Sequence, residues 1–162
     1  MSLPDANHWI SKLNLQPHPE GGYYKEVFRS SQYVRREESN SLKHACTSIY
    51  YLLEHADFSG FHRIMSDEIW YFHQGGPLNI HIITEKGDYQ LSELSDSQTG
   101  SLCLVVPAGL WFAADIPGKQ GYTLVSCAVA PGFEFAEFEM ADKQQLIGEY
   151  PIHEKLFDRL CR

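Results

Sequence analysis

The sequence predicts an all-β protein, a sandwich or barrel with short helices at its two ends. Short aromatic and β-branched runs follow one another from Tyr23 to Met140, and turn sequences such as QGGP, EKGD and IPGKQG separate them. No long helical pattern interrupts these runs, which favours two packed sheets over an α/β fold. With 162 residues, 43% of them hydrophobic and 13% aromatic, the chain can bury one sizeable core. We therefore expect a single domain over residues 1–162, with the barrel core at about 21–140.

A short helix is expected first. Ser2 and Asp5 have capping-box spacing, and three apolar side chains then fall on one helical face: Trp9, Ile10 and Leu13. The following stretch, residues 14–22, contains two prolines and two glycines and cannot continue the helix.

The strands are expected next. About nine or ten strands are predicted, within residues 22–30, 46–53, 60–64, 68–73, 77–84, 89–94, 101–107, 122–130 and 133–140. The charged stretch at residues 35–44 is expected to be an exposed loop.

Two helical segments close the chain. Residues 141–147 form a short candidate helix that Gly148 is expected to stop. Pro151 then opens a second helix, whose apolar stripe would pack on the outside of the sheet and consists of Ile152, Leu156, Phe157 and Leu160.

Charge and cysteine usage exclude several classes of protein. The net charge of −8, from 13 basic and 21 acidic residues, disfavours general affinity for nucleic acid or anionic membranes. The four cysteines are widely spaced and indicate neither a disulfide framework nor a zinc knuckle. Without a signal-peptide pattern or an apolar run of about 20 residues, we expect a cytoplasmic protein.

His62 and Glu68 are the first candidates for chemistry. Because alternate residues of a strand share a face, Glu68 shares its face with Trp70 and Phe72. A tight connection at Ser66 would bring His62 alongside Glu68. An imidazole and a carboxylate pointing into one barrel give either metal ligands or a proton-transfer pair. A satisfied core pair is the structural alternative.

The segment HPEGG supplies a second group of candidates. Glu20 precedes Gly21 and Gly22, which let the backbone turn sharply. A functional interpretation places Glu20, Glu26 or Arg29 at the mouth of a pocket, with Arg29 pairing with a carboxylate or phosphate. A tight turn followed by an edge strand is the alternative.

Two motifs resemble those of the cupin superfamily. In GFHRIMSDEIWYFHQG, His62, Glu68 and Gly75 match the first histidine, the glutamate and the closing glycine of the first cupin motif. The second histidine of that motif falls at Ile64. The second motif is similar to PAGLWF, with Phe112 at its histidine position.

Four longer segments resemble the small, functionally uncharacterised family called cupin type five. They are HPEGGYYKEVFRS, HRIMSDEIWYFHQGGPL, VVPAGLWFAAD and CAVAPGFEFAEFEMA. The resemblance implies a double-stranded β-helix, the jelly-roll or cupin barrel, and a homodimer.

The departures from the cupin pattern argue against a metal. A transition-metal site needs about three protein ligands, and neither Ile64 nor Phe112 can donate. His73 should face away from Glu68 by strand parity, while the orientation of His81 cannot be fixed across the QGGP turn. We therefore expect no metal and no other cofactor, with His81 kept as a ligand-binding candidate.

A drier pocket would follow from these replacements. A desolvated carboxylate beside a histidine has a perturbed proton affinity that suits acid–base chemistry. Four aromatic side chains would give the pocket flat walls that favour a cyclic ligand: Trp70, Phe72, Trp111 and Phe112. Ordinary core filling is the alternative for these rings.

Three functions remain open. The first is a metal-independent isomerase or epimerase of a carbohydrate-like substrate, by analogy with metal-free sugar-nucleotide epimerases of the superfamily. In it His62 is the base, Glu68 its partner, and Tyr50 or Tyr71 the acid. The second is a non-catalytic protein that binds a small molecule, and the third is a metal-dependent oxygenase or hydrolase that uses a replacement ligand.

Overall fold

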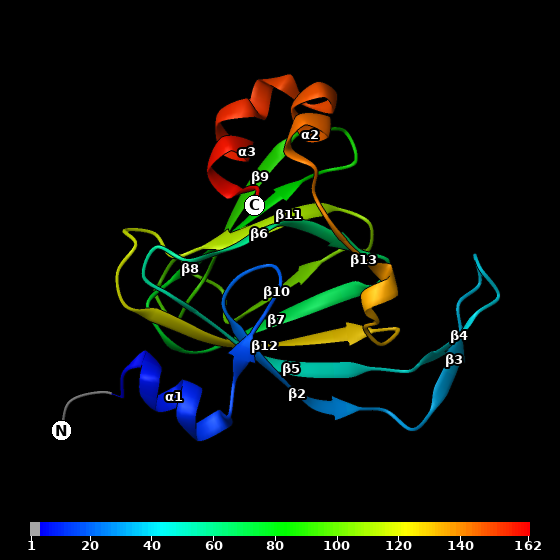
Figure 1. Cartoon of the computed structure of the whole chain (residues 1–162), viewed down its shortest axis with the longest axis horizontal. Coiled ribbons are helices and arrows are strands. Elements are labelled where there is room, and N and C mark those ends of the chain that lie inside the picture. Colours follow the sequence, from blue (N-terminus) through cyan, green and yellow to red (C-terminus); the bar gives the residue numbers. More distant parts are fainter. Residues whose placement is uncertain (1–3) are drawn as a thin grey trace.

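Two antiparallel sheets packed face to face form the body of the protein (Figure 1), which a computed structural model describes for residues 4–162. The six-stranded sheet has the order β1-β2-β5-β12-β7-β10 and the five-stranded sheet the order β13-β6-β11-β8-β9. A separate two-stranded sheet joins β3 and β4. The strands are β1 Gln16–Pro17, β2 Tyr23–Arg29, β3 Tyr33–Arg35, β4 Leu42–His44, β5 Thr47–Glu54, β6 Phe58–Ile64, β7 Asp67–Gly75, β8 Leu78–Ile83, β9 Tyr89–Leu94, β10 Cys103–Val106, β11 Trp111–Asp115, β12 Tyr122–Ala130 and β13 Phe138–Met140.

The space between the two sheets holds the main core. Each strand of the sandwich directs alternate side chains inward, as β7 does with buried Glu68 and Trp70 and exposed Tyr71. The buried core residues are Tyr51, Leu53, Trp70, Leu78, Ile80, Ile82, Leu94, Val106, Phe112, Ala114, Ile116, Val125 and Cys127. This arrangement confirms the prediction of an all-β barrel.

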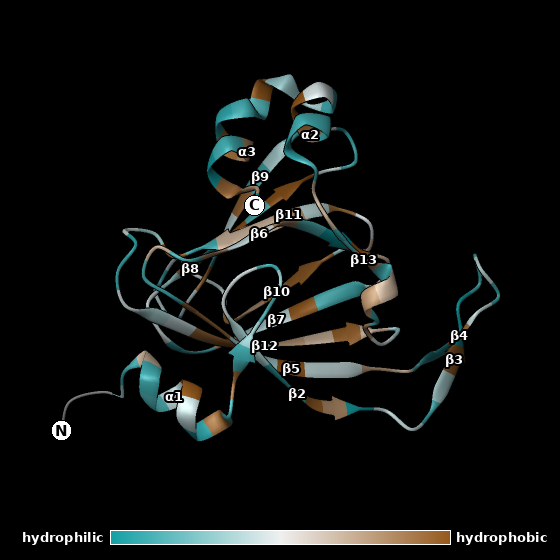
Figure 2. Ribbon diagram, viewed as in Figure 1, coloured by the Kyte–Doolittle hydropathy of each residue, from teal (hydrophilic) through white to brown (hydrophobic). Residues whose placement is uncertain are grey.

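Helices cover the outer faces of both sheets. α1 (Ala6–Leu13) lies against the six-stranded sheet, whereas α2 (Lys143–Glu149) and α3 (Glu154–Leu160) lie over the five-stranded sheet (Figure 1). The apolar face of α3 turns to the sheet, where Phe157 packs edge-on against Phe61 with ring centroids 5.2 Å apart. Brown, apolar stretches accordingly lie on strands of the sandwich, such as β10, and on parts of the helices that cover it (Figure 2). No helix in residues 4–162 has the length and apolar character needed to cross a membrane.

Several boundaries differ from the sequence-based prediction. Asp5 is itself the N-cap of α1 and accepts a hydrogen bond from the His8 amide at 2.9 Å, while Ser2 lies outside the described residues. Gly148 does not stop α2, which continues to Glu149. The run at residues 133–140 is not one strand, because the 3-10 helix η1 (Phe135–Glu137) precedes β13. A second 3-10 turn, η2 (Pro151–His153), comes before α3.

The charged stretch at residues 35–44 is not a free loop. It forms the β3–β4 hairpin, which projects from the sandwich (Figure 1). Two of its cations, Arg36 and Lys43, are buried by ion pairs with acidic residues of the segment that follows β12. The expected exposure holds for six of the ten residues, but charge alone gives no sign of the distant carboxylates that pair with Arg36 and Lys43.

β11 was not among the predicted strands. All five of its residues are buried, so it lacks the alternation of polar and apolar side chains that marks a strand with one face in water. The main core covers one face of β11, and the C-terminal helices cover the other.

Candidate functional site

A cavity of about 200 Å³ lies between the sheets and the segment that joins β12 to β13. It is small beside the ~300–1,000 Å³ of pockets for drug-sized ligands. Its walls come from β2, β5, β6, β7 and β12, from the turn before β2 and from residues 133–138. The lining residues are Gln16, His18, Glu20, Tyr24, Lys25, Glu26, Arg29, Thr47, Ile49, His62, Ile64, Glu68, Cys127, Val129, Phe133, Glu134, Phe135 and Phe138.

His62 lies in the wall that β6 provides. Only 2% of its surface is exposed. Nδ1 lies 2.7 Å from the Gly60 carbonyl oxygen, and Nε2 lies 3.3 Å from Oε2 of Glu20. The ring packs on Phe112, the direct partner of His62 on β11, with centroids 4.2 Å apart. Both nitrogens of His62 therefore face protein oxygens.

Glu20 reaches the cavity from the tight turn ahead of β2. Gly21 and Gly22 have φ angles of +114° and +68°, and a side chain at either position would strike backbone oxygens. The Tyr51 hydroxyl donates to the Gly21 carbonyl at 2.7 Å, and the Gly22 amide donates to Asp57 at 2.8 Å. The turn is thus fixed on both sides, which positions the Glu20 side chain.

Glu20 and His62 form a pair that can hold one proton between them. A carbonyl oxygen only accepts hydrogen bonds, so Nδ1 of His62 carries the hydrogen that bonds Gly60. Nε2 of neutral His62 is then an acceptor that faces another acceptor, Oε2 of Glu20. Ser59 donates to the other carboxylate oxygen at 3.0 Å. A proton added between Nε2 and Oε2 turns a contact of two acceptors into a hydrogen bond.

His18 flanks this pair. The Glu20 amide donates to Nδ1 of His18 at 3.2 Å, which makes Nδ1 an acceptor. Burial lowers the pKa of His18, and the nearby Glu20 carboxylate opposes this only in part. His18 is therefore neutral at neutral pH, so its 3.5 Å approach to Glu20 is not an ion pair.

Glu68 lines the same cavity from β7 and is 7% exposed. Burial raises its pKa to about 8, and repulsion from Glu20 adds to the effect. The Cys127 thiol and the Trp70 indole lower the pKa only partly. Glu68 is consequently a protonated, neutral carboxylic acid at pH 7.

Cys127 and aromatic rings complete the walls. Burial raises the pKa of the Cys127 thiol well above its usual value, so it stays protonated. Phe135 stacks on His18, with ring centroids 6.0 Å apart, and Phe133 packs edge-on against Phe135 at 5.0 Å. The deep cavity therefore combines neutral polar groups with flat apolar surfaces.

The mouth of the cavity carries charged residues. Arg29 forms a bidentate ion pair with Glu26, at 2.9 and 2.8 Å, and donates to the Phe133 carbonyl at 3.1 Å. Glu20, Glu26 and Arg29 all line the cavity, Glu20 as a buried residue, and their role in binding a ligand stays a prediction. The carboxylate that Arg29 meets, however, belongs to this chain.

The predicted contact between His62 and Glu68 is wrong. β6 and β7 belong to different sheets, so the connection at Ser66 places the two side chains on different walls of the cavity. The carboxylate that contacts His62 is Glu20, from a turn 42 positions earlier in the chain. Glu68 remains in the cavity as a separate group.

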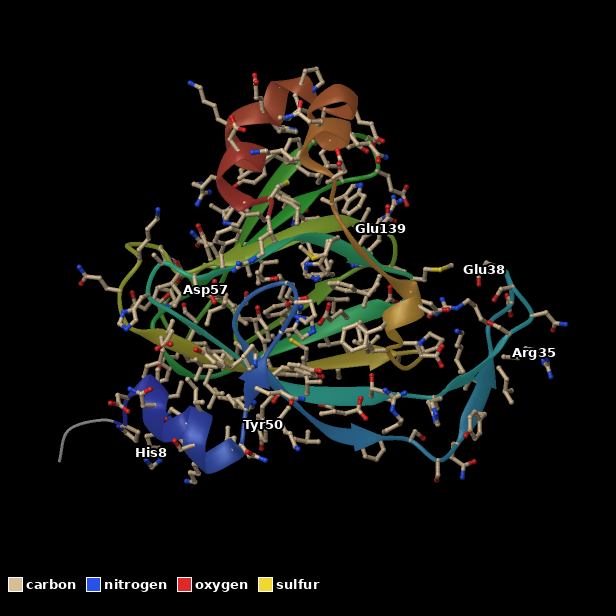
Figure 3. All side chains as sticks on the ribbon, in the orientation of Figure 1. His8, Arg35, Glu38, Tyr50, Asp57 and Glu139 are labelled. Atoms are coloured by element: carbon tan, nitrogen blue, oxygen red, sulfur yellow. The ribbon has the colours of Figure 1, made fainter. Side chains whose placement is uncertain are left out.

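Neither tyrosine proposed as the acid lines the cavity. Tyr50 lies on the outer face of the six-stranded sheet, in the cluster beneath α1 (Figure 3). Tyr71 is 40% exposed, on the face of β7 opposite to Glu68. Adjacent residues of a strand face opposite sides of the sheet. Tyr50 follows inward-facing Ile49 and Tyr71 follows inward-facing Trp70, so both tyrosines face outward and neither can be the acid.

Two of the predicted ligand-binding residues face the C-terminal helices. His81 is buried between Tyr89 and Asp115, each 2.9 Å from one of its nitrogens. Trp111 packs in the cluster beneath α2 and α3, with Arg63 over its ring at 4.3 Å. These residues stabilise the outer layer and are absent from the cavity lining.

The other three predicted aromatic residues belong to the core. Trp70 and Phe112 are each 1% exposed within the main core, and Phe72 packs against it. They touch the site only indirectly, through Glu68 and His62. The core-filling interpretation therefore holds for them.

The donor set does not fit the metal site that the cupin pattern implies. Ile64 lines the cavity without a donor atom, and the Phe112 ring packs on His62. Within residues 4–162, no three His, Cys, Asp or Glu side chains are grouped to hold an ion. Glu68, being protonated, is also a poor ligand.

Sequence reasoning missed several residues of the cavity. His18, Thr47, Cys127 and the ring of Phe138 were not proposed. His18 could have been predicted, because it stands in the segment HPEGG only two residues before the candidate Glu20. The other three come from strands whose inward faces read as ordinary core.

Two sheets in this strand order, closed around a cavity, define a jelly-roll barrel of the cupin class. A family model described as "Cupin superfamily (DUF985)" matches residues 7–141, and the chain belongs to this family.

Solved structures agree with this assignment. A hypothetical protein from Leishmania major is similar over 98% of this chain and 99% of its own, with 37% identity and a TM-score of 0.91. A protein from Shewanella oneidensis is similar over 99% of both chains, with 33% identity and a TM-score of 0.89. Oxalate decarboxylase from Bacillus subtilis shares the fold alone, with 17% identity and a TM-score of 0.56 over 89% of this chain and 36% of its own. No curated protein matches the sequence.

Proposed function

We propose that this cupin binds a small cyclic, carbohydrate-like carbonyl compound and moves a proton on the carbon next to the carbonyl. Such a reaction would make it a metal-independent isomerase or epimerase. The observation that carries the proposal is one small cavity that holds a neutral carboxylic acid, Glu68, together with a proton-accepting pair, Glu20 and His62. A proton donor and a proton acceptor in one pocket are the groups that acid–base catalysis requires.

Each group has one role in the proposed reaction. The Glu20–His62 pair takes the proton from carbon, and this proton lies between Nε2 of His62 and Oε2 of Glu20. Glu68 donates a hydrogen bond to the carbonyl oxygen, which gains negative charge as the proton leaves. Return of the proton to the neighbouring carbon would isomerise the substrate, whereas epimerisation requires the enolate to turn its other face to the pair before the proton returns to the same carbon.

Supporting residues hold this geometry. Ser59 and the fixed Gly21–Gly22 turn orient Glu20, and the Gly60 carbonyl orients His62. Apolar walls formed by Ile49, Ile64 and Val129 exclude water from the reacting groups. Glu68 takes over the acid role that the sequence had suggested for Tyr50 or Tyr71.

Deuterium exchange in heavy water tests the proposal. The protein is incubated with a panel of cyclic keto sugars, uronates and lactones, and NMR detects deuterium entering next to the carbonyl. We expect exchange of at least one compound, and E68Q and E20Q should slow it by about 100- to 10,000-fold, the usual share of acid–base groups. E139Q is the matched control, because Glu139 lies at the surface on β13 and pairs with Arg63 (Figure 3).

Two results would argue for other functions. A compound that stabilises the protein without exchanging deuterium supports the non-catalytic binding protein. At 100 times its dissociation constant such a compound should add about 2.7 kcal/mol to the free energy of unfolding. Exchange that persists unchanged in both E68Q and E20Q would remove the assigned roles.

A further inference from the structure

The groups around Glu68 form a cluster of hydrogen-bond donors at the cavity wall. Cys127 and Trp70 are direct partners on β12 and β7, and both are 1% exposed. The thiol and the indole N–H each lie close enough to Glu68 to influence its carboxyl group. Trp70 Nε1 nevertheless completes no hydrogen bond of normal geometry within the described residues. The indole N–H only donates and the thiol is a weak acceptor, so the hydroxyl of Glu68 is available to a ligand in the cavity.

We propose that the cavity selects planar cyclic ligands that carry one oxyanion, an enolate or phenolate oxygen, and that this oxygen lies against Glu68. The inference rests on the proposed function, since an enolate is what proton removal next to a carbonyl produces. It adds the class of molecule that the site prefers: a cyclic carbonyl compound whose ring flattens when it enolises, with a single ionisable oxygen.

The charge of the cavity favours this class. His18 is neutral and Cys127 is protonated, so neither adds charge. With one proton shared, the Glu20–His62 pair carries no net charge. A ligand that arrives as a neutral enol or phenol can place its proton on this pair and its oxygen on Glu68. The transfer leaves the net charge of the cavity unchanged, because the negative charge moves from the Glu20–His62 pair to the ligand oxygen at Glu68.

The shape of the cavity favours a flat ring. Tyr24, Phe133, Phe135 and Phe138 line it with aromatic surfaces, and His18 adds a fifth ring. Rings of this kind stack on planar ligands more closely than on puckered ones. The opposite wall is aliphatic and offers no further polar contact at Ile49 or Val129.

The mouth does not favour a phosphorylated ligand. Arg29 lies there, but Glu26 neutralises it through two hydrogen bonds. Glu134 also lines the mouth and is held by Lys43 at 2.9 Å. A doubly charged phosphate would therefore meet carboxylates at the entrance.

4-Nitrophenol is a direct probe, because its ionised form has a visible absorbance that its neutral form lacks. We expect the protein at pH 7 to bind 4-nitrophenol and raise the ionised fraction of the bound probe. 4-Nitroanisole, which has the same ring but cannot ionise, should bind at least about tenfold more weakly. Glu68→Leu, which replaces the buried acid with an apolar side chain of similar size, should weaken 4-nitrophenol binding by about 10- to 100-fold, as expected for a hydrogen bond to a charged group. E139Q should leave the binding unchanged.

The outcomes separate this inference from the proposed function. Equal binding of 4-nitroanisole, or full binding by Glu68→Leu, overturns the oxyanion site. Absence of any binding also overturns it, while deuterium exchange can still occur and would leave the proposed reaction standing. Should Glu68→Leu unfold, E68Q provides the second variant, because an amide donates more weakly than a carboxylic acid and should give a smaller loss in the same direction.

Discussion

The proton on Glu68 is a property of its surroundings. The side chain reaches from β7 into the cavity, where it is buried, and the Glu20 carboxylate lines the same cavity. Both desolvation and repulsion favour the neutral form. The acid therefore needs no special residue, only a barrel interior that lacks the metal-binding side chains of the superfamily's pattern.

This shift makes the stability of the fold depend on pH. The folded-state pKa of Glu68, about 8, is above the value of about 4.5 in the unfolded chain. Between these values the folded protein holds a proton that the unfolded chain has released. The stability that this proton gives to the folded state is therefore fully present below pH 4.5. It is lost as the pH rises through 8, at about 1.4 kcal/mol per pH unit.

E68Q should remove this dependence. An uncharged amide does not titrate, so the thermal midpoint of E68Q should fall less than that of the wild type between pH 5 and pH 8.5. Thermal unfolding followed by circular dichroism measures the difference, with E139Q as the control. Parallel curves for E68Q and the wild type would mean that Glu68 is ionised in the folded state at neutral pH.

At the residue scale, the alternation of side chains along a strand predicts which residues face the cavity, and it also excludes the two tyrosines that the sequence suggested. It placed Glu68 and Trp70 on one face of β7, and the same rule puts Tyr71 on the other. Neighbouring Trp111 and Phe112 likewise cannot both face inward. The contact of Glu20 with His62 was beyond local rules, because it depends on how a turn ahead of β2 meets a strand of the other sheet.

At the scale of elements, the segment after β12 forms a wall of the cavity that ion pairs hold in place. Lys43 of β4 lies 2.9 Å from Glu134 and 2.7 Å from Glu137, and Arg36 lies 3.0 Å from Glu137. The aromatic rings of this wall, including half-exposed Phe135, follow the position of η1. The projecting hairpin thus stabilises one side of the site.

K43M should loosen this wall. Removing the cation leaves Glu134 without its ion pair, and largely buried Glu137 keeps only Arg36 as a partner. Hydrogen exchange of amides in residues 133–138 should become about tenfold faster, since local opening is then easier. K143M is the matched control, because Lys143 makes only a longer, exposed contact of 3.6 Å with Asp158. Equal exchange in K43M and the wild type would show that backbone contacts alone hold the wall.

Which elements could be predicted depended on their exposure. β9 and β12 match the predicted runs because turn sequences bound them at both ends. β11 was missed because helices cover its outer face, and the β3–β4 hairpin was missed because its charges are paired over long distances. Information of this kind lies in the packing of elements and not in any one of them.

At the scale of the whole molecule, exposed apolar side chains indicate a partner surface. Phe28 on β2, Tyr33 on β3 and Leu42 on β4 are 52%, 55% and 57% exposed. A two-stranded hairpin has little stability of its own, and such side chains on a projecting one favour a contact with another surface.

We expect a homodimer that uses this hairpin. Sedimentation velocity at micromolar concentrations should give the mass of two chains, and F28E combined with L42E should shift the protein to a monomer. V105E is the control, since Val105 is 50% exposed on β10, the outermost strand at the other edge of the six-stranded sheet. A wild-type monomer, or a dimer that F28E and L42E together leave intact, would contradict the expectation.

The placement of the acid and the proton-accepting pair on opposite sheets has a mechanical consequence. Glu68 belongs to the six-stranded sheet and His62 to the five-stranded one, so the gap between them depends on the spacing of the two layers. That spacing is set by the filling of the interior, by residues such as Leu53 and Ile80 that never meet a ligand. The rate of any reaction that needs both groups therefore depends on how the barrel interior is packed. Substitutions deep in the interior should change this rate although the substituted residues contact no ligand.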